Sequence, residues 1–293
     1  MPTSPGRVVD TSAMGITKRS RDRAATPGAA SGAAQRPAPL THSLSSAPEP
    51  QRRAERRFSF AALTPVLLLR TAHPRQALLT AVGVAGAAAL AGRSGRELGL
   101  VFLTVLVGQG ILGWHNDLVD RRRDARHENP GKPIAQGTLD PGTVWFTLTC
   151  AVFLVVPLSI ANGVTAGSAY LLAVAVGLLA NVILRKGLLS WLPWAVQFAL
   201  YPAFLSYGGW GGAFEGNPPE ISITVLAALL GVGVHVLRAL PGLVADNEDG
   251  YRHLPLRIAL KIGATRLLVI GSVYTVAVLV ALLLTGNAVG LSQ

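Results

Sequence analysis

The sequence predicts an all-α integral membrane protein, a bundle of about seven transmembrane helices. Half of the 293 residues are hydrophobic and only 14% are charged, with a mean hydropathy of +0.43. Several apolar runs reach the roughly 20 residues that cross a hydrocarbon core. Because backbone groups in hydrocarbon must be hydrogen-bonded within the protein, we expect these runs to be helices.

The first part of the chain has a different composition. Residues 1–57 are rich in Ala, Ser, Pro and Arg and have no apolar periodicity, so they cannot bury enough surface to fold. They lack the apolar segment of a secretory signal. Organelle transit peptides share this Arg-rich, acid-poor character, but the Ala, Gly and Arg bias of the whole chain also suits a GC-rich bacterial genome. We expect a disordered basic tail over 1–57 and a transmembrane domain over 58–293.

Each of the seven expected spans is an apolar run of helical length. The first run is the weakest because its core is short and rich in Ala and Gly, and small residues of this kind suit close helix packing. The expected spans cover approximately 76–92, 98–115, 142–161, 165–184, 189–208, 221–241 and 264–286.

The basic residues predict the orientation. If the N-terminal tail is cytosolic and the spans alternate, all but two of the 26 Lys and Arg residues lie on the cytosolic side, the exceptions being Arg93 and Arg96. This asymmetry follows the positive-inside rule. The net charge of +11 is then explained by topology, so we expect no nucleic-acid partner. The expected location is a bacterial plasma membrane, crossed several times.

Two acidic clusters follow even-numbered spans and therefore face the same side. The first contains Asn116, Asp117, Asp120 and Asp124, and the second contains Asp246 and Asp249. If the second span continues as a helix, the i, i+3, i+7 spacing places the three aspartates of the first cluster on one face. Carboxylates near a bilayer are costly and usually functional. Two such clusters opposite each other could hold Mg²⁺ on a diphosphate. A solvated loop, in which residues 121–123 pair with these acids, is the alternative.

The motifs resemble the UbiA superfamily of intramembrane prenyltransferases. Residues 116–124 match the family's Asn-Asp-x-x-Asp-x-x-x-Asp motif, and Lys132-Pro133-Ile134-Ala135-x-Gly137 is similar to the stretch that follows it. Residues 240–257 resemble the second aspartate region. Two features differ from the family pattern. Gly242 stands one turn before Asp246 where an aspartate is usual, and the chain ends about two helices earlier than the usual nine.

The resemblance implies a helix bundle around a lateral cavity in which Mg²⁺ holds a polyprenyl diphosphate, whose isoprenoid chain passes to a small, aromatic acceptor. Lys132 and Arg252 would contact phosphate. The aromatic faces of Tyr170, Phe198, Tyr201 and Tyr207 could stabilise an allylic cation, although helix packing or an interfacial position is the favoured explanation for each of them. The implied metal and diphosphate residues, which include the catalytic aspartates, are Asn116, Asp117, Asp120, Asp124, Asp246 and Asp249.

Other functions remain open at this point. Some family members transfer phosphoribosyl to a polyprenyl phosphate, and the altered second region would also suit a non-catalytic isoprenoid-binding protein or one that needs partner helices. The Asp-Gly-x-x-Ala-Arg signature of CDP-alcohol phosphatidyltransferases is absent from the sequence. A soluble isoprenoid synthase would not need seven apolar spans.

Overall fold

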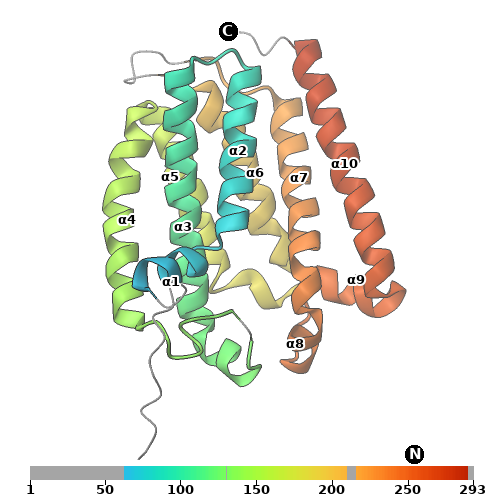
Figure 1. Cartoon of the computed structure of the whole chain (residues 1–293). Helices are drawn as coiled ribbons and strands as arrows, with labels where there is room; N and C mark the ends of the chain where they lie inside the picture. Colours follow the sequence, from blue (N-terminus) through green and yellow to red (C-terminus); the bar gives the residue numbers. More distant parts are fainter. Residues whose placement is uncertain (1–62, 130, 210–215, 290–293) are drawn as a thin grey trace, which may run out of the picture. The chain divides into compact units, whose positions relative to one another are not determined.

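The computed structural model describes residues 63–129, 131–209 and 216–289. They all belong to one compact unit, Arg56–Gln293, and every regular element among them is a helix (Figure 1). The expected tail over 1–57 lies outside the described residues.

Seven long helices occupy the positions of the seven expected spans. In the described part of the chain, three short helices and three 3-10 segments precede or connect them, and the short helices α1, α8 and α9 lie near the same ends of the long ones (Figure 1). The long helices are α2 (Pro74–Leu90), α3 (Gly95–Arg126), α4 (Pro141–Ala161), α5 (Val164–Ala180), α6 (Leu192–Ser206), α7 (Ile221–Ala239) and α10 (Ala264–Val289). The short elements are α1 (Thr64–Thr71), η2 (Leu184–Lys186), η3 (Leu188–Trp191), η5 (Leu240–Gly242), α8 (Leu243–Glu248) and α9 (Leu254–Ile262).

Five segments of the described chain are long and apolar enough to cross a membrane. They contain α3, α4, α6, α7 and α10, while α5 is apolar but shorter. The prediction of an all-α membrane protein is therefore confirmed. The number of seven crossings stays a prediction, because α2 and α5 have only 17 residues each.

Local sequence signals determine where several helices begin. At the start of α3, the backbone N–H of Ser94 donates to Glu97 Oε2 at 2.9 Å, as in a capping box. At the start of α4, Asp140 Oδ2 accepts from the backbone N–H of Thr143 at 2.8 Å, and Pro141 occupies the first turn. These caps satisfy backbone N–H groups that have no partner within the helix.

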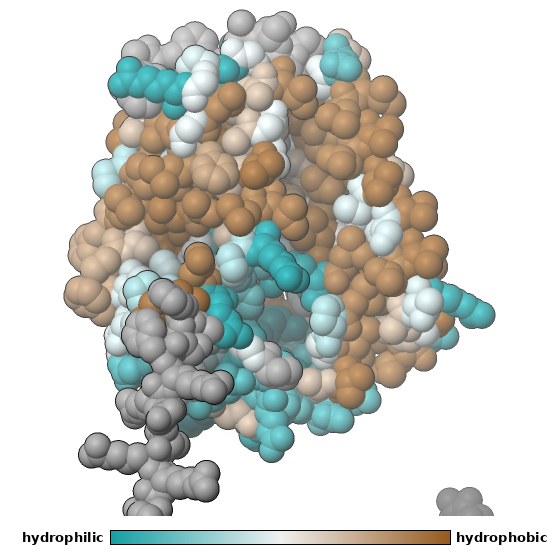
Figure 2. All heavy atoms as spheres, viewed as in Figure 1, coloured by the Kyte–Doolittle hydropathy of each residue, from teal (hydrophilic) through white to brown (hydrophobic). Residues whose placement is uncertain are grey.

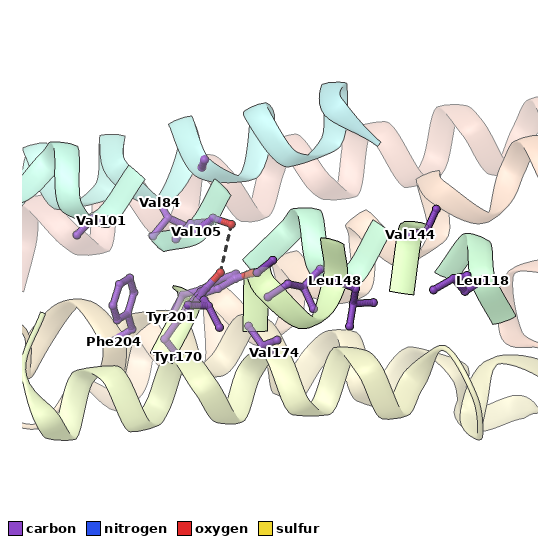
Figure 3. Packing of buried hydrophobic residues seen from close by; sticks show 14 of the residues in the cluster. Val84, Val101, Val105, Leu118, Val144, Leu148, Tyr170, Val174, Tyr201 and Phe204 are labelled. Atoms are coloured by element: carbon purple, nitrogen blue, oxygen red, sulfur yellow. Dashed lines mark hydrogen bonds between the residues drawn. The ribbon is translucent and has the colours of Figure 1, made fainter. Parts of the chain in front are cut away.

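Consecutive long helices pack against each other from α2 to α7, and α10 packs against α7 (Figure 1). A cluster of buried side chains, which come mainly from α2, α3, α4, α5 and α6, lies inside the bundle (Figure 3). There the rings of Tyr170 and Phe204 are 4.9 Å apart, and the Tyr170 hydroxyl donates to the Val105 carbonyl at 3.2 Å. Tyr170 therefore belongs to the core rather than to a substrate site.

The outer surface of the bundle is largely hydrophobic. On the face shown in Figure 2, hydrophobic residues form a broad area above a hydrophilic lower end. Large apolar side chains such as Phe153 and Leu79 are each 75% exposed. Soluble monomers rarely expose contiguous apolar areas of this kind. The surface therefore fits a protein surrounded by lipid.

Close contact between α4 and α5 depends on Gly167. A Cβ atom at this position would lie 2.6 Å from the Ser159 carbonyl carbon and 2.9 Å from the Ile160 nitrogen, which are backbone atoms and cannot turn away. We expect Gly167→Ala to lower the stability by about 1–3 kcal/mol because the two helices must separate. The apparent melting temperature in detergent measures this effect.

The matched control for this prediction is Gly83→Ala. Nothing lies within 4 Å of a Cβ atom at Gly83, so we expect its melting temperature to stay close to that of the wild type. Equal melting temperatures for both variants would show that α4 and α5 do not approach each other so closely.

Candidate functional site

The last turns of α3 carry the first acidic cluster. This helix has 32 residues and is therefore about 48 Å long, which exceeds a hydrocarbon thickness of about 30 Å. Asp117, Asp120 and Asp124 are buried, with exposures of 3%, 7% and 7%. The second span does continue as a helix, which is the condition under which the acidic spacing places the three aspartates on one face, and this face points to the protein interior.

Each aspartate of this cluster lies beside a cation. Asp117 Oδ1 is 2.5 Å from Lys132 Nζ and 2.8 Å from His73 Nε2. Lys132 Nζ also lies 3.6 Å from Asp124 Oδ2, and Asp120 Oδ1 accepts a hydrogen bond from Arg185. Among the described residues, Oδ2 of Asp117 and Oδ2 of Asp120 have no partner. Two carboxylate oxygens thus remain available to a ligand.

Lys132 reaches the cluster because the loop after α3 folds back on itself. Pro133 and Ile134 are buried, and the Gln136 N–H donates to the Lys132 carbonyl at 3.0 Å. Gly137 closes this turn with a φ of +70°, which glycine adopts without strain. The loop stretch quoted from the sequence therefore positions its lysine beside two aspartates.

His73 is a site residue that the sequence analysis missed. It precedes α2 in a left-handed conformation, with a φ of +52°, which is uncommon for a residue other than glycine. Backbone strain of this kind often marks functional positions. A single histidine before a proline gives no signal in the sequence, because its partner Asp117 is 44 residues away.

We expect His73→Asn to weaken Mg²⁺ binding about tenfold. Asparagine tolerates the left-handed backbone, but it is too short to hold Asp117 in place. The variant's affinity for Mn²⁺, followed by electron paramagnetic resonance as a substitute for Mg²⁺, measures the effect. Arg75→Gln, which changes an exposed neighbour, is the control, and equal affinities of the two variants would contradict a positioning role.

The second acidic cluster is tied to α3 by Arg123. Asp246 is 8% exposed and its Oδ1 accepts from Arg123 Nη2 at 2.6 Å. Asp249 Oδ2 accepts from Arg123 Nε, and His127 Nε2 lies 3.2 Å from the same oxygen. The hydrogen bond from Arg123 lowers the pKa of Asp249 to about 2, so this carboxylate is ionised at neutral pH. Of the basic run 121–123, Arg123 alone pairs with acids of the described segments, whereas its two neighbours are exposed.

A cavity of about 240 Å³ lies among α2, α3, α5, α6 and α7. Figure 2 shows a hollow with hydrophilic walls below the hydrophobic area. Three of the expected site residues line the cavity, namely Asn116, Asp120 and Asp246. Its lining also includes Phe198 and Tyr201, two of the four aromatic candidates. Polar and aromatic side chains thus line the same cavity.

The remaining expected residues lie outside this lining. Asp117 and Asp124 pair with Lys132, and Asp249 pairs with Arg123. Arg252 is exposed and its Nη1 donates to the Tyr251 carbonyl at 2.8 Å. The geometry therefore gives Arg252 no direct part in the cavity.

Arg185 is a second residue that the sequence analysis missed as a site residue. It lies on η2, lines the cavity, and its buried Nε has no hydrogen-bond partner among the described residues. Buried N–H groups are nearly always paired. An anionic ligand in the cavity would satisfy this donor. The sequence shows Arg185 only as one of two loop cations, since its partner Asp120 is 65 residues away.

The donor set of the first cluster suits Mg²⁺. No group of three or more His, Cys, Asp or Glu side chains in the described part of the chain is arranged to hold a metal ion alone. Mg²⁺, however, binds through one or two carboxylates together with substrate phosphates and water. Asn116 and Asp120 provide hard oxygen donors at the cavity wall, so the residues present fit a magnesium ion that is shared with a diphosphate.

Comparison with known proteins identifies the family of the chain and shows which solved structures share its fold. The sequence model of the UbiA prenyltransferase family matches residues 77–292. Two solved structures of a UbiA homolog from Archaeoglobus fulgidus are similar, one bound to GPP and Mg²⁺ (TM-score 0.58, 18% identity, 75% of this chain and 78% of that chain). The other is bound to DMAPP and Mg²⁺ (TM-score 0.57, 19% identity, covering 74% of this chain and 78% of that chain). At this identity the likeness shows the fold. No curated protein matches the sequence.

Proposed function

Since the chain belongs to the UbiA prenyltransferase family, we propose that it transfers an isoprenoid chain from a polyprenyl diphosphate to a small aromatic acceptor. The observation that carries this proposal is the cavity, where Asn116, Asp120 and Arg185 line the same space as Phe198 and Tyr201. A diphosphate needs cations and metal ligands, and an isoprenoid chain needs apolar walls. The similar homolog structures, which contain prenyl diphosphates and Mg²⁺, support this proposal.

The cations of the site would bind the diphosphate and stabilise its departure. When bound, Mg²⁺ supplies positive charge that offsets the charge developing on the diphosphate as the C–O bond breaks. Asn116 and Asp120 would hold the ion, while Asp117 and Asp124 orient Lys132 behind them. Arg185 would donate its unpartnered Nε–H to a phosphate oxygen. Donors fixed in place before the reaction are effective because they need no rearrangement.

The inner part of the cavity would hold the isoprenoid chain and the acceptor. Phe198 and Tyr201 present aromatic rings whose centroids are 5.3 Å apart, and such rings attract a carbocation. Gln109 and Gln197 are buried cavity residues, and Gln109 Nε2 donates to the Tyr201 hydroxyl at 3.3 Å. Polar side chains this deep suit the polar group of an acceptor. We place the acidic end of the bundle on the cytosolic side, in accordance with the distribution of basic residues.

A transfer assay with purified protein tests the proposal. The protein in liposomes is given labelled geranyl, farnesyl or longer diphosphates with a panel of aromatic acceptors, in the presence of Mg²⁺ or EDTA. We expect a prenylated product that requires Mg²⁺. A parallel reaction offers phosphoribosyl diphosphate and polyprenyl phosphate. Product only in that reaction, or binding without any turnover, would overturn the proposed transfer.

A further inference from the structure

Arg123 has a position that the proposed function does not yet explain. It belongs to the first acidic cluster in sequence, yet its side chain crosses to the second cluster and contacts both Asp246 and Asp249. Its side chain is 18% exposed and lines the cavity. We propose that the second cluster holds this guanidinium in place of a metal ion, and that Arg123 supplies the positive charge for the diphosphate at this wall. The inference rests on the proposed function and concerns how the same site binds its donor substrate.

Both carboxylate oxygens of Asp246 are already occupied by the protein. Oδ1 accepts from Arg123 Nη2 at 2.6 Å, and Oδ2 is 2.9 Å from His253 Nε2. His253 Nδ1 accepts from the backbone N–H of Leu256 at 3.1 Å, so the imidazole proton is on Nε2 and points at Asp246. This hydrogen bond also begins α9, because His253 is its N-terminal cap. A metal ion at Asp246 would have to share an oxygen that already accepts one of these hydrogen bonds.

The second cluster also lacks a carboxylate pair facing the cavity. A Cβ atom at Gly242 would lie 3.3 Å from Asp246 Oδ2, so an acidic side chain there would stand beside Asp246. Glycine provides no such ligand. Asp249 is occupied by Arg123 and His127 and does not line the cavity. The first cluster differs, since Asp117 and Asp120 each keep one oxygen without a described partner.

Arg123 retains donors for a ligand after these contacts. Its Nε–H is directed to Asp249 and its Nη2 to Asp246, while Nη1 has no partner among the described residues. The Tyr251 ring lies 4.9 Å from Arg123 Cζ and supports the guanidinium from one face. The planar arrangement of guanidinium donors matches phosphate oxygens. Two carboxylates and one ring therefore hold a cation at the cavity wall with N–H groups to spare.

The number of bound metal ions shows whether the second cluster holds Arg123 alone or also binds a metal ion. Purified protein in detergent is titrated with Mn²⁺ in the presence of geranyl S-thiolodiphosphate, which is a poor leaving-group analogue, and bound Mn²⁺ is counted by electron paramagnetic resonance. We expect Asp246→Asn and Arg123→Gln to bind the same number of Mn²⁺ ions as the wild type. Their affinity for the analogue should fall roughly 10- to 100-fold, because a charged hydrogen bond is lost. Asp120→Asn should lose bound Mn²⁺.

Arg122→Gln is the matched control, because Arg122 precedes Arg123 and is exposed. It should bind the analogue and Mn²⁺ like the wild type. Arg123→Lys keeps the charge but lacks the planar donors. Its affinity for the analogue should be intermediate between those of Arg123→Gln and the wild type. If Asp246→Asn does not fold, Asp249→Asn provides the same comparison, because Asp249 also anchors Arg123.

Two outcomes would overturn the inference. One is the loss of a Mn²⁺ ion in Asp246→Asn relative to the wild type, which would make Asp246 a metal ligand. The other is unchanged affinity for the analogue in Arg123→Gln. A wild-type protein that binds neither the analogue nor Mn²⁺ would contradict the proposed function itself, and this result is distinct from both.

Discussion

Asp120→Asn should reduce the rate of prenyl transfer on the order of 100- to 1,000-fold. Asp120 is the aspartate of the first cluster that lines the cavity, and its Oδ2 has no partner among the described residues. Asparagine has nearly the same shape but lacks the charge that holds Mg²⁺ on the diphosphate. Losing one preorganised electrostatic contact at a reacting centre has effects of this size. The rate is measured in single turnovers at saturating prenyl diphosphate, with bound Mn²⁺ counted in parallel.

Asp140→Asn is the control for this charge removal. Asp140 is exposed, caps α4 and does not line the cavity, and asparagine caps a helix as well as aspartate does. Its transfer rate should stay near that of the wild type. A folded Asp120→Asn variant with full activity and full Mn²⁺ binding would show that the first cluster does not hold the metal.

Arg185→Gln should lower the affinity for prenyl diphosphate and the rate of transfer together, by about 100-fold in kcat/KM. The change removes one of the cations that line the cavity and leaves Asp120 without its guanidinium partner. The buried Nε–H that has no acceptor is the reason for expecting a direct contact with the substrate. Binding of geranyl S-thiolodiphosphate and steady-state kinetics measure the two effects.

Lys186→Gln is the matched control, because Lys186 follows Arg185 directly and is exposed. Lys186 Nζ lies 5.4 Å from the centre of the Tyr251 ring, which is a weak interaction at an exposed site. We expect an effect much smaller than that of Arg185→Gln. Similar losses in both variants would indicate a general effect of positive charge at this end of the bundle rather than a specific contact.

The positions of the helices could be predicted because they depend on local sequence. Each of the seven long helices occupies a predicted apolar run. Because α3 continues beyond the second span, the spacing of Asp117, Asp120 and Asp124 places them on one face, as expected for that case. Helix lengths were less predictable. The fourth expected span, 165–184, ends as a helix at Ala180, and residues 184–186 form η2, which carries Arg185.

The contacts that assemble the site could not be predicted, since they join residues far apart in the sequence. His73 meets Asp117 across 44 residues, and Arg123 meets Asp246 across 123 residues. The alternative that residues 121–123 pair with acids of the first cluster was partly right. Arg123 does pair with two acids, but these are Asp246 and Asp249 of the second cluster. One sequence has no period or motif that records such a pairing, which depends on how α3 and α8 lie relative to each other within the bundle.

The most direct test of the account is an experimental structure of the protein with geranyl S-thiolodiphosphate and Mn²⁺. We predict metal density beside Asn116 and Asp120, with the diphosphate in contact with Arg185 and with Nη1 of Arg123. The isoprenoid chain should point along the cavity toward Tyr201. A diphosphate bound outside the cavity, or metal density on Asp246 with none on Asp120, would contradict the account.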